Sequence, residues 1–500
     1  MILTILILLP LVGAVVTAVV PGALARLVGL GFAAATLVAG VVVATQYDAG
    51  GGMQLTETHT WIESLGVHYA LGVDGLGLLM ILLTVVLVPI VLLAGWRESD
   101  EPGNSGARAF FAWTLALEAM SLAVFAATDV LLFYVVFEAT LIPAYFLIGG
   151  FGRAGRGRAA TKFLIYQLAG GLIMLASVIG LYVVSANAGN PSFLLSDLAA
   201  IDIDETTQRW LFVGFFIAFA IKAPMFPVHT WLADTTEKAT TGTSVLLVCV
   251  LDKIGTFGML RFCLGLLPDA SQWATPVVVA LALVSIIYGA LVAIGQDDVL
   301  RLIGLTSLSH FGFIVLGIFV FSSTGGAGAI LYMVNHGIAT ALMFLVAGFL
   351  IRRTGTASIR QMGGVERTAP VLAGFFLVAG LAAAGLPGLS PFVSEMLVII
   401  AAFDHHWLVG SVAVLAIVLA AFYALWMYER TMTGGGRGAA GREGLAPVAD
   451  LDRREVGILA PLLLALVLFG FYPMPLLDVI NPVVHDTLAE VGIGQEGGPQ

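Results

Sequence analysis

Six ionisable side chains lie inside long apolar stretches of this 500-residue sequence, where a charge is costly and usually serves a function. Burial raises the pKa of a carboxyl group and lowers that of a lysine, whereas a neighbouring opposite charge has the reverse effect. Such groups can be poised to gain and lose a proton near neutral pH, as a proton relay requires. The six residues are Glu138, Lys222, Lys253, His310, His336 and Glu395.

The segment 220–231 is the most unusual of these stretches, because Lys222 is followed closely by two prolines, Pro224 and Pro227. Each proline removes a backbone donor and breaks the helical hydrogen-bond ladder. Broken backbone at membrane depth is tolerated only where it is buried in protein or lines a water-filled cavity. We therefore predict a discontinuous helix at an ion site. The alternative is a proline-kinked helix whose lysine extends to the membrane surface.

The composition is that of a membrane protein, since 59% of the residues are hydrophobic and only 11% are charged. Soluble domains carry roughly 25% charged residues. Apolar runs of about 17–25 residues predict an all-α polytopic protein with about fourteen transmembrane helices. The seventh span, 209–232, and the twelfth, 369–402, contain internal Pro and Gly and should be discontinuous. The N-terminus has no basic region or cleavage site, so we interpret it as a retained first span.

Loop charge predicts the orientation of the chain. With the N-terminus outside, 18 of the 22 Lys and Arg residues fall in cytoplasmic loops and two in outer loops. Both termini should then lie on the outer side of the cell inner (plasma) membrane. Spans 4–8 and 9–13 form two five-helix sets of opposite orientation, each with a broken fourth member, which predicts two inverted repeats. We expect four units. They are an N-terminal three-helix segment (1–107), the first repeat (108–264), the second repeat (265–430), and a C-terminal unit of cytoplasmic loop, last span and periplasmic tail (431–500).

Metal, disulfide and nucleotide chemistry find no support in the residue spacing. Cys249 and Cys263 are about 21 Å apart on one helix and cannot pair. Zinc needs three or four closely arranged ligands, which the His and Cys spacing does not supply. Two G-x-G-x-x-G stretches, Gly150–Gly155 and Gly436–Gly441, lack the strand and helix that a dinucleotide site requires. We expect no cofactor or nucleic acid to bind this chain.

Structural explanations exist for the buried ionisable residues as well. A lone histidine within a span can simply bond a neighbouring helix, and Glu138 with Lys222 could be a static ion pair that sets packing. Six such groups on six different spans favour a relay.

Three further residues are weaker candidates for the relay. Glu118 lies within a span but has no motif around it, and Asp252 could simply neutralise Lys253. His229 could link the site to the cytoplasm or cap a helix end.

The sequence resembles the antiporter-like, proton-pumping subunits of respiratory complex I, the type I NADH:quinone oxidoreductase. The resemblance runs almost end to end, and the lysine–proline segment is its most specific part. Glu395 on the second broken span favours the M type, like the fourth mitochondrial chain, because the L and N types place a lysine there. The matching stretches include Phe137-Glu-Ala-Thr-Leu-Ile-Pro143, Ile221-Lys-Ala-Pro-x2-Pro-x-His-x-Trp-Leu232, Lys253-Ile-Gly-x2-Gly258 and Ser309-His-Phe-Gly312.

The resemblance implies a role for each of the six residues. Glu138 and Lys222 would form the charge-switching pair. The connecting relay would consist of Lys253, His310 and His336, and Glu395 would be the terminal site toward the periplasm. We expect Glu395 to be the counterpart of Lys222 in the second repeat. One departure is visible, because the family usually reads Glu-Ala-Pro-Thr where this chain has Glu237-Lys-Ala-Thr240.

The resemblance also implies partners and a driving reaction. Protons would move from cytoplasm to periplasm, coupled to quinone reduction in other subunits. NADH, FMN, iron–sulfur clusters and quinone are expected in those subunits, with L- and N-type chains as neighbours in the bilayer. One alternative is a subunit of a multisubunit cation/proton antiporter. Another is a membrane scaffold whose buried charges only lock helices together.

Overall fold

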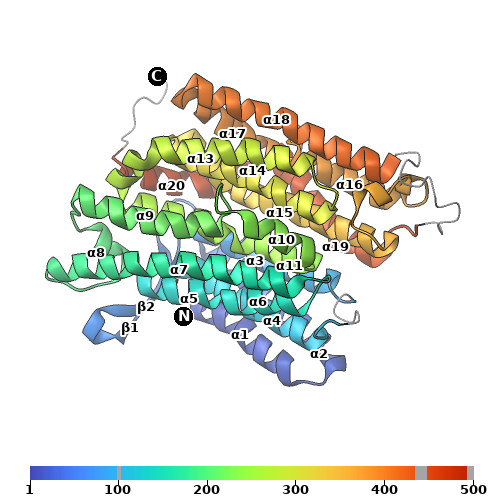
Figure 1. The fold of residues 1–500 in the computed structure, drawn as a ribbon. Coiled ribbons are helices and arrows are strands. Elements are labelled where there is room, and N and C mark those ends of the chain that lie inside the picture. The colour runs from blue at the N-terminus through green and yellow to red at the C-terminus, as the bar shows by residue number, and fades with distance from the viewer. Residues whose placement is uncertain (98–102, 434–447, 493–500) are drawn as a thin grey trace.

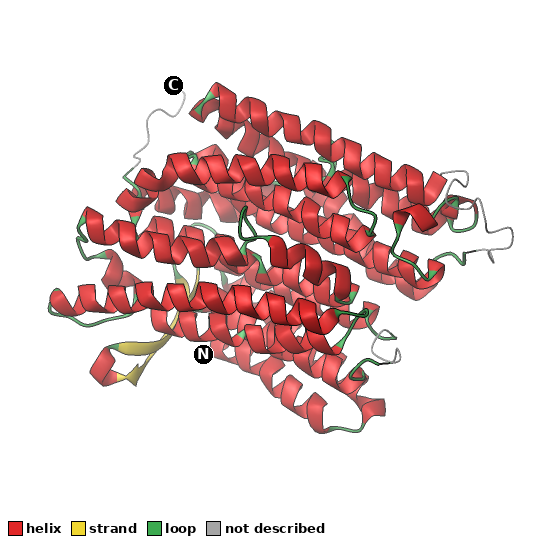
Figure 2. Cartoon of the chain, in the orientation of Figure 1, coloured by secondary structure: helices red, strands yellow, loops and turns green. Residues whose placement is uncertain are grey.

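A computed structural model covers the chain, and the structure describes residues 1–97, 103–433 and 448–492. The described residues are almost entirely helical, with one β-hairpin (Figure 2). The long helices run side by side through one bundle, and most loops gather at its two ends (Figure 1).

The bundle begins with a group of three long helices. These are α1 (Ile2–Val19), α2 (Gly22–Gln46) and α3 (Gly75–Ala94), with β1 (Gln54–Ile62), η1 (Glu63–Leu65) and β2 (Val67–Val73) forming an antiparallel hairpin between α2 and α3. This hairpin was not predicted from the sequence.

The first predicted repeat contains several short helical pieces. It consists of α4 (Ala107–Ala126), α5 (Val130–Ala139), α6 (Leu141–Gly150), α7 (Arg156–Asn187), α8 (Leu195–Ala199), α9 (Glu205–Lys222), α10 (Thr230–Lys238), α11 (Thr241–Val245), η3 (Leu246–Leu251), α12 (Lys253–Gly258) and η4 (Met259–Leu264). The segments η3 and η4 are π-helical.

The second predicted repeat and the C-terminal helices complete the bundle. They are α13 (Pro268–Ile294), α14 (Val299–Phe319), α15 (Ser323–Thr354), η5 (Ile359–Gln361), η6 (Val365–Arg367), α16 (Pro370–Ala383), α17 (Ser390–His405), α18 (Trp407–Tyr428), η7 (Glu429–Thr433), α19 (Arg453–Phe471) and α20 (Met474–Glu490).

The predicted polytopic all-α architecture is confirmed. Twelve helical segments among the described residues are long and apolar enough to cross a membrane. The broken pairs α9/α10 and α16/α17 are not among these twelve, and they coincide with the two spans expected to be discontinuous. The total of about fourteen spans stays a prediction, which these two pairs would complete.

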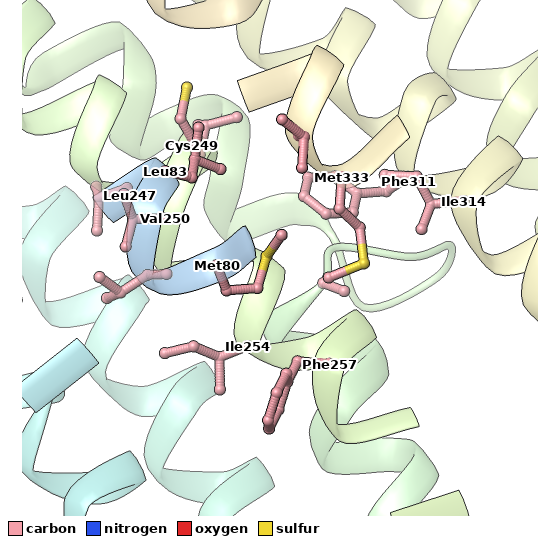
Figure 3. Packing of buried hydrophobic residues seen from close by; sticks show 14 of the residues in the cluster. Met80, Leu83, Leu247, Cys249, Val250, Ile254, Phe257, Phe311, Ile314 and Met333 are labelled. Carbon is pink, nitrogen blue, oxygen red and sulfur yellow. The ribbon is translucent and has the colours of Figure 1, made fainter. Parts of the chain in front are cut away.

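The most deeply buried helices meet at the middle of the bundle. In the spans 241–264 and 299–319 every residue except Arg261 and Arg301 is buried, whereas fewer than half of the residues of α1, α2, α18 and α19 are buried. Figure 3 shows the junction, where Met80 of α3 and Ile254 of α12 lie near Met333 of α15. Within a bilayer such close packing stabilises the fold through van der Waals contacts between helices, because lipid is as apolar as the buried side chains.

The inverted repeat is visible in a pattern of local hydrogen bonds. Asp129 begins α5 and Asp298 begins α14, the second helix of each set, and each aspartate bonds two amides of its own helix. Asp129 pairs in a strand-like bridge with Leu194, and Asp298 pairs in the same way with Ser358. Five predicted crossings separate the two aspartates, so they lie at opposite ends of the bundle. The same cap and bridge therefore recur upside down in the two halves.

The long loop of about residues 430–454 is rich in Gly and Arg, a composition that predicts a flexible segment. Residues 434–447 lie outside the described part of the chain, but residues 429–433 continue α18 as the π-helix η7. Arg353 of α15 donates to the carbonyls of Ala449 and Asp450 and forms an ion pair with Glu455. Flexibility is therefore the wrong description for the two ends of this loop, because the first end continues a helix and Arg353 holds the second.

Candidate functional site

The first broken helix exposes backbone groups that nearby side chains satisfy. Helix α9 ends at Lys222 and α10 begins at Thr230, so residues 223–229 form the predicted break. Pro224 has no N–H for the Ala220 carbonyl, which accepts from the Met225 amide instead. The freed Ile221 carbonyl accepts a 3.0 Å hydrogen bond from Trp231 Nε1. The tryptophan of the motif therefore closes the break.

Lys222 is buried, with 1% of its surface exposed, so it does not extend to the membrane surface. Its Nζ donates to Thr140 Oγ1 at 3.2 Å and lies 4.7 Å from the centre of the Phe137 ring. Thr140 occupies an interruption between α5 and α6, which the sequence analysis did not predict. Pro143 explains the interruption, because it leaves the Ala139 carbonyl without its helical donor.

Glu138 lies two residues before Thr140 and is half-buried. Its Oε1 is buried and has no hydrogen-bond partner among the described residues. No ion pair within 4.0 Å joins Glu138 to Lys222 in the described chain, so Lys222 of α9 bonds Thr140, two residues after Glu138, without direct contact with the carboxyl group. A Cβ atom on Gly171 of α7 would lie 1.7 Å from Glu138 Oε1. Only glycine at 171 leaves room for the carboxyl group.

Lys253 has closer partners than Lys222. Its Nζ lies 2.5 Å from His336 Nδ1 of α15 and donates to the Val248 carbonyl at 3.2 Å. The π-helical turn supplies this acceptor, because the Asp252 amide donates to Leu247 instead of Val248. Single π-helical turns within α-helices are frequent at functional sites. The alternative that Asp252 simply neutralises Lys253 is not supported by a direct ion pair among the described residues.

The two histidines lie next to each other. The ring centres of His310 and His336 are 5.2 Å apart. His310 Nε2 lies 3.3 Å from the Tyr423 hydroxyl and 3.3 Å from the Ala383 carbonyl, the last residue of α16. The chain of polar groups therefore reaches the second broken helix.

Glu395 lies on α17, just after the second break, and is buried. Its Oε1 accepts from the Tyr332 hydroxyl at 2.5 Å. A Cβ on Gly385, which has a left-handed φ of 68°, would lie 2.0 Å from Glu395 Oε2. Lys222 precedes its break and Glu395 follows its own, so the two residues lie on opposite sides of the two breaks. A corresponding role of the two residues in the two repeats stays a prediction.

The structure brings Lys253, His336, His310 and Glu395 together through two tyrosines that sequence reasoning missed. The Tyr332 ring centre lies 5.9 Å from that of His310, so this phenol stands between His310 and Glu395. Tyrosines in apolar spans usually serve packing, so neither Tyr332 nor Tyr423 gave a distinct signal. Lys222 and Glu138 lie at the other broken helix.

The weaker candidates differ in their surroundings. Glu118 is buried, and neither of its carboxyl oxygens has a partner among the described residues. His229 packs between the rings of Phe226 and Tyr288 at 6.0 and 5.3 Å, and its Nδ1 is buried without a described partner. Asp252 is 1% exposed. The described residues contain no group of three or more His, Cys, Asp or Glu that could hold a metal ion.

The departure from the family motif lies in a cluster of charges. Glu237 pairs with Lys238 at 2.6 Å and with Arg301 at 2.8 Å, and Arg301 also pairs with Asp234 at 2.6 Å. Asp234 in turn pairs with Lys162 at 2.7 Å. The cluster ties α7, α10 and α14 together at the end of the first broken helix. Lys238 therefore adds an ion pair where the family usually has no charge.

The bundle of paired broken helices around a buried string of titratable groups defines a multi-pass membrane protein of the antiporter-like class. The sequence model of the family described as NADH:quinone oxidoreductase/Mrp antiporter, TM, matches residues 127–420, and the chain belongs to this family.

Named relatives cover nearly the whole chain. It is 46% identical to NADH-quinone oxidoreductase subunit M of Mycobacterium tuberculosis over 98% of this chain and 94% of that protein. It is 35% identical to NADH-ubiquinone oxidoreductase chain 4 of Arabidopsis thaliana over 96% of each protein.

Solved structures show the same fold. A chain of respiratory complex I from Thermus thermophilus with bound NADH superposes with a TM-score of 0.88 at 33% identity, covering 99% of this chain and 100% of that chain. A chain of the Mrp complex from Dietzia superposes with a TM-score of 0.84 at 20% identity, covering 98% and 99%. At that identity the second likeness concerns the fold alone.

Proposed function

We propose that this chain is an M-type, proton-translocating subunit of the membrane arm of an NADH:quinone oxidoreductase. The observation that carries the proposal is the buried sequence of polar contacts from Lys253 through His336 and His310 toward Glu395. Near-complete coverage of relatives named subunit M or chain 4 supports the same assignment. The chain would sit between other membrane-arm subunits in the plasma membrane, with both termini outside.

In this mechanism Glu138 and Lys222 form a switchable charge pair in the first repeat. A lysine out of water can release its proton when its carboxylate partner moves or is neutralised. The proton would pass through Lys253 and the two histidines and leave from Glu395 toward the periplasm. Redox chemistry would remain in partner subunits, where NADH, FMN, iron–sulfur clusters and quinone are expected. This chain would move protons without a redox centre of its own.

A cation/proton antiporter subunit is the second candidate function. The family description and the fold shared with the Mrp complex favour it. Glu395 in place of a lysine favours the first function. Sodium-driven proton exchange without NADH would identify an antiporter.

The decisive test is Lys222→Arg in the assembled complex. Arginine keeps the positive charge but does not deprotonate in proteins, because its pKa stays above about 12. We expect normal assembly, with strongly reduced NADH-driven acidification of inverted vesicles and reduced quinone reduction. Wild-type acidification by this variant would contradict the relay and favour a scaffold of fixed ion pairs.

A further inference from the structure

The two lysines of the relay are separated by a gap in the described polar contacts. Lys222 bonds Thr140 on the side of α5, whereas Lys253 bonds His336 on α15. In the described part of the chain, no series of hydrogen bonds or ion pairs connects the Lys222 ammonium to the Lys253 ammonium. A proton moving from the first repeat to the second must cross this gap.

Helix α12 packs directly against the first broken helix. A Cβ on Gly255 would lie 2.4 Å from the Ala223 nitrogen and 2.6 Å from the Phe219 carbonyl oxygen. A Cβ on Gly258 would lie 2.3 Å from the Phe219 ring. The glycine face of α12 therefore touches the backbone immediately after Lys222.

Asp252 lies on this glycine face. It precedes Gly255 by three residues, and residues three apart share one side of a helix. Lys253 is one position further and points about 100° around the axis, toward His336. The Asp252 side chain thus leaves α12 on the side that packs against the first broken helix, whereas the Lys253 ammonium points toward His336.

The Asp252 carboxyl group is buried and incompletely bonded. The residue is 1% exposed, and its Oδ2 has no hydrogen-bond partner among the described residues. A buried carboxylate with a free oxygen is costly unless that oxygen has a partner in some state of the protein. A transferred proton would supply such a partner.

We propose that Asp252 carries the proton across the gap from Lys222 to Lys253. In the first step the Lys222 ammonium gives a proton to the Asp252 carboxylate, which leaves a neutral amine and a neutral acid. In the second step the acid gives this proton to the Lys253 amine, which regenerates the carboxylate and forms an ammonium. Each step moves one proton and conserves the summed charge of its pair.

The test compares Asp252→Asn with Asp252→Glu in the assembled complex in inverted vesicles. Asparagine keeps the volume but accepts no proton, so NADH-driven acidification should fall at least about tenfold. Glutamate remains titratable and should keep most of the activity. Thr256→Val is the matched control, because it removes a hydroxyl one turn away that, among the described residues, bonds only the Lys253 carbonyl. This control should pump normally.

A solvent isotope measurement separates proton transfer from a structural role. If Asp252→Asn makes transfer across the gap rate-limiting, its residual NADH oxidation should slow more in D2O than that of the wild type. Normal pumping by Asp252→Asn would overturn the proposal. So would equal loss in the Asn and Glu variants without an enlarged isotope effect. If the Asn variant does not assemble, an assembled Glu variant that fails to pump is the contrary result.

The inference rests on the proposed relay function, and the experiment distinguishes the two. If Lys222→Arg stalls pumping and Asp252→Asn does not, only the role of Asp252 is wrong. If Lys222→Arg also pumps normally, the relay function itself fails.

Discussion

At the scale of single residues, two glycines make room for the two outermost carboxyl groups of the candidate relay. Gly171 faces Glu138 and Gly385 faces Glu395, and in each case a methyl group would overlap a carboxyl oxygen. The carboxyl groups of Glu138 and Glu395 thus occupy space that is free because the neighbouring residue is glycine and has no side chain. Such positions carry no chemistry of their own, so a search for titratable residues does not reveal them.

Gly171→Ala should displace the Glu138 carboxyl group. The new methyl group on α7 would lie 1.7 Å from Glu138 Oε1, so the Glu138 side chain must move away from α7. We expect an assembled complex with NADH-driven acidification reduced several-fold or more. Gly157→Ala on the same helix is the control, because a Cβ there meets no atom within 4 Å. Equal activity of the two variants would show that the position of Glu138 does not matter for pumping.

The sequence predicted the charged members of the site better than their polar partners. Lys222 and Glu395 stand out because an isolated charge in an apolar run has few explanations. Tyr332 and Tyr423 do not, because a phenol in such a run usually packs like phenylalanine. Which hydroxyl meets which carboxyl group depends on the packing of α14, α15 and α17, and local sequence does not encode that packing.

At the scale of helices and strands, the two broken helices could be predicted from the sequence. The π-helical stretches, the hairpin and the cap of α16 could not. Pro224 and Pro227 remove donors wherever they occur, so the break follows from local chemistry. The π-helical stretches around Lys253 and the hairpin 54–73 depend on long-range contacts instead. Helix α16 is a further example, since no side chain within its own first turn caps it.

Asp450 caps α16 from a distant segment. Its two carboxyl oxygens accept from the Val371 and Leu372 amides, each at 2.9 Å. Burial alone would raise the pKa of Asp450, but these backbone hydrogen bonds hold it below its usual value. Because the folded-state pKa is lowered, the stabilisation is present above the ordinary aspartate pKa. It is lost as pH falls through the lowered value.

Asp450→Ala should loosen the first turn of α16. Loss of a cap costs roughly 1 kcal/mol, so hydrogen exchange of the Val371 and Leu372 amides should speed up about fivefold near neutral pH. In the parent protein the same protection should fall as the solution becomes strongly acidic. The exposed Asp404 offers a control, since its replacement by Ala should leave these amides unchanged. Unchanged exchange in Asp450→Ala would show that the cap is unimportant.

At the scale of the whole molecule, orientation depends on loop charge. Single cysteines can test it, because Cys249 and Cys263 are both buried and should not react with an impermeant maleimide. In sealed inverted vesicles Gly157→Cys should be labelled directly, since it lies at the proposed cytoplasmic end. Asn190→Cys should be labelled only after permeabilisation. The opposite pattern would reverse the proposed orientation.

The two halves of the relay differ in connectivity, and this has a kinetic consequence. From Lys253 onward the polar groups already lie in or near contact, whereas Glu138, Lys222 and Lys253 are separated. Transit through the second half should therefore be rapid, and control of flux should reside in the first half. A drug or substitution that slows the second half slightly would then change turnover little. An equal perturbation near Lys222 would change it almost proportionally.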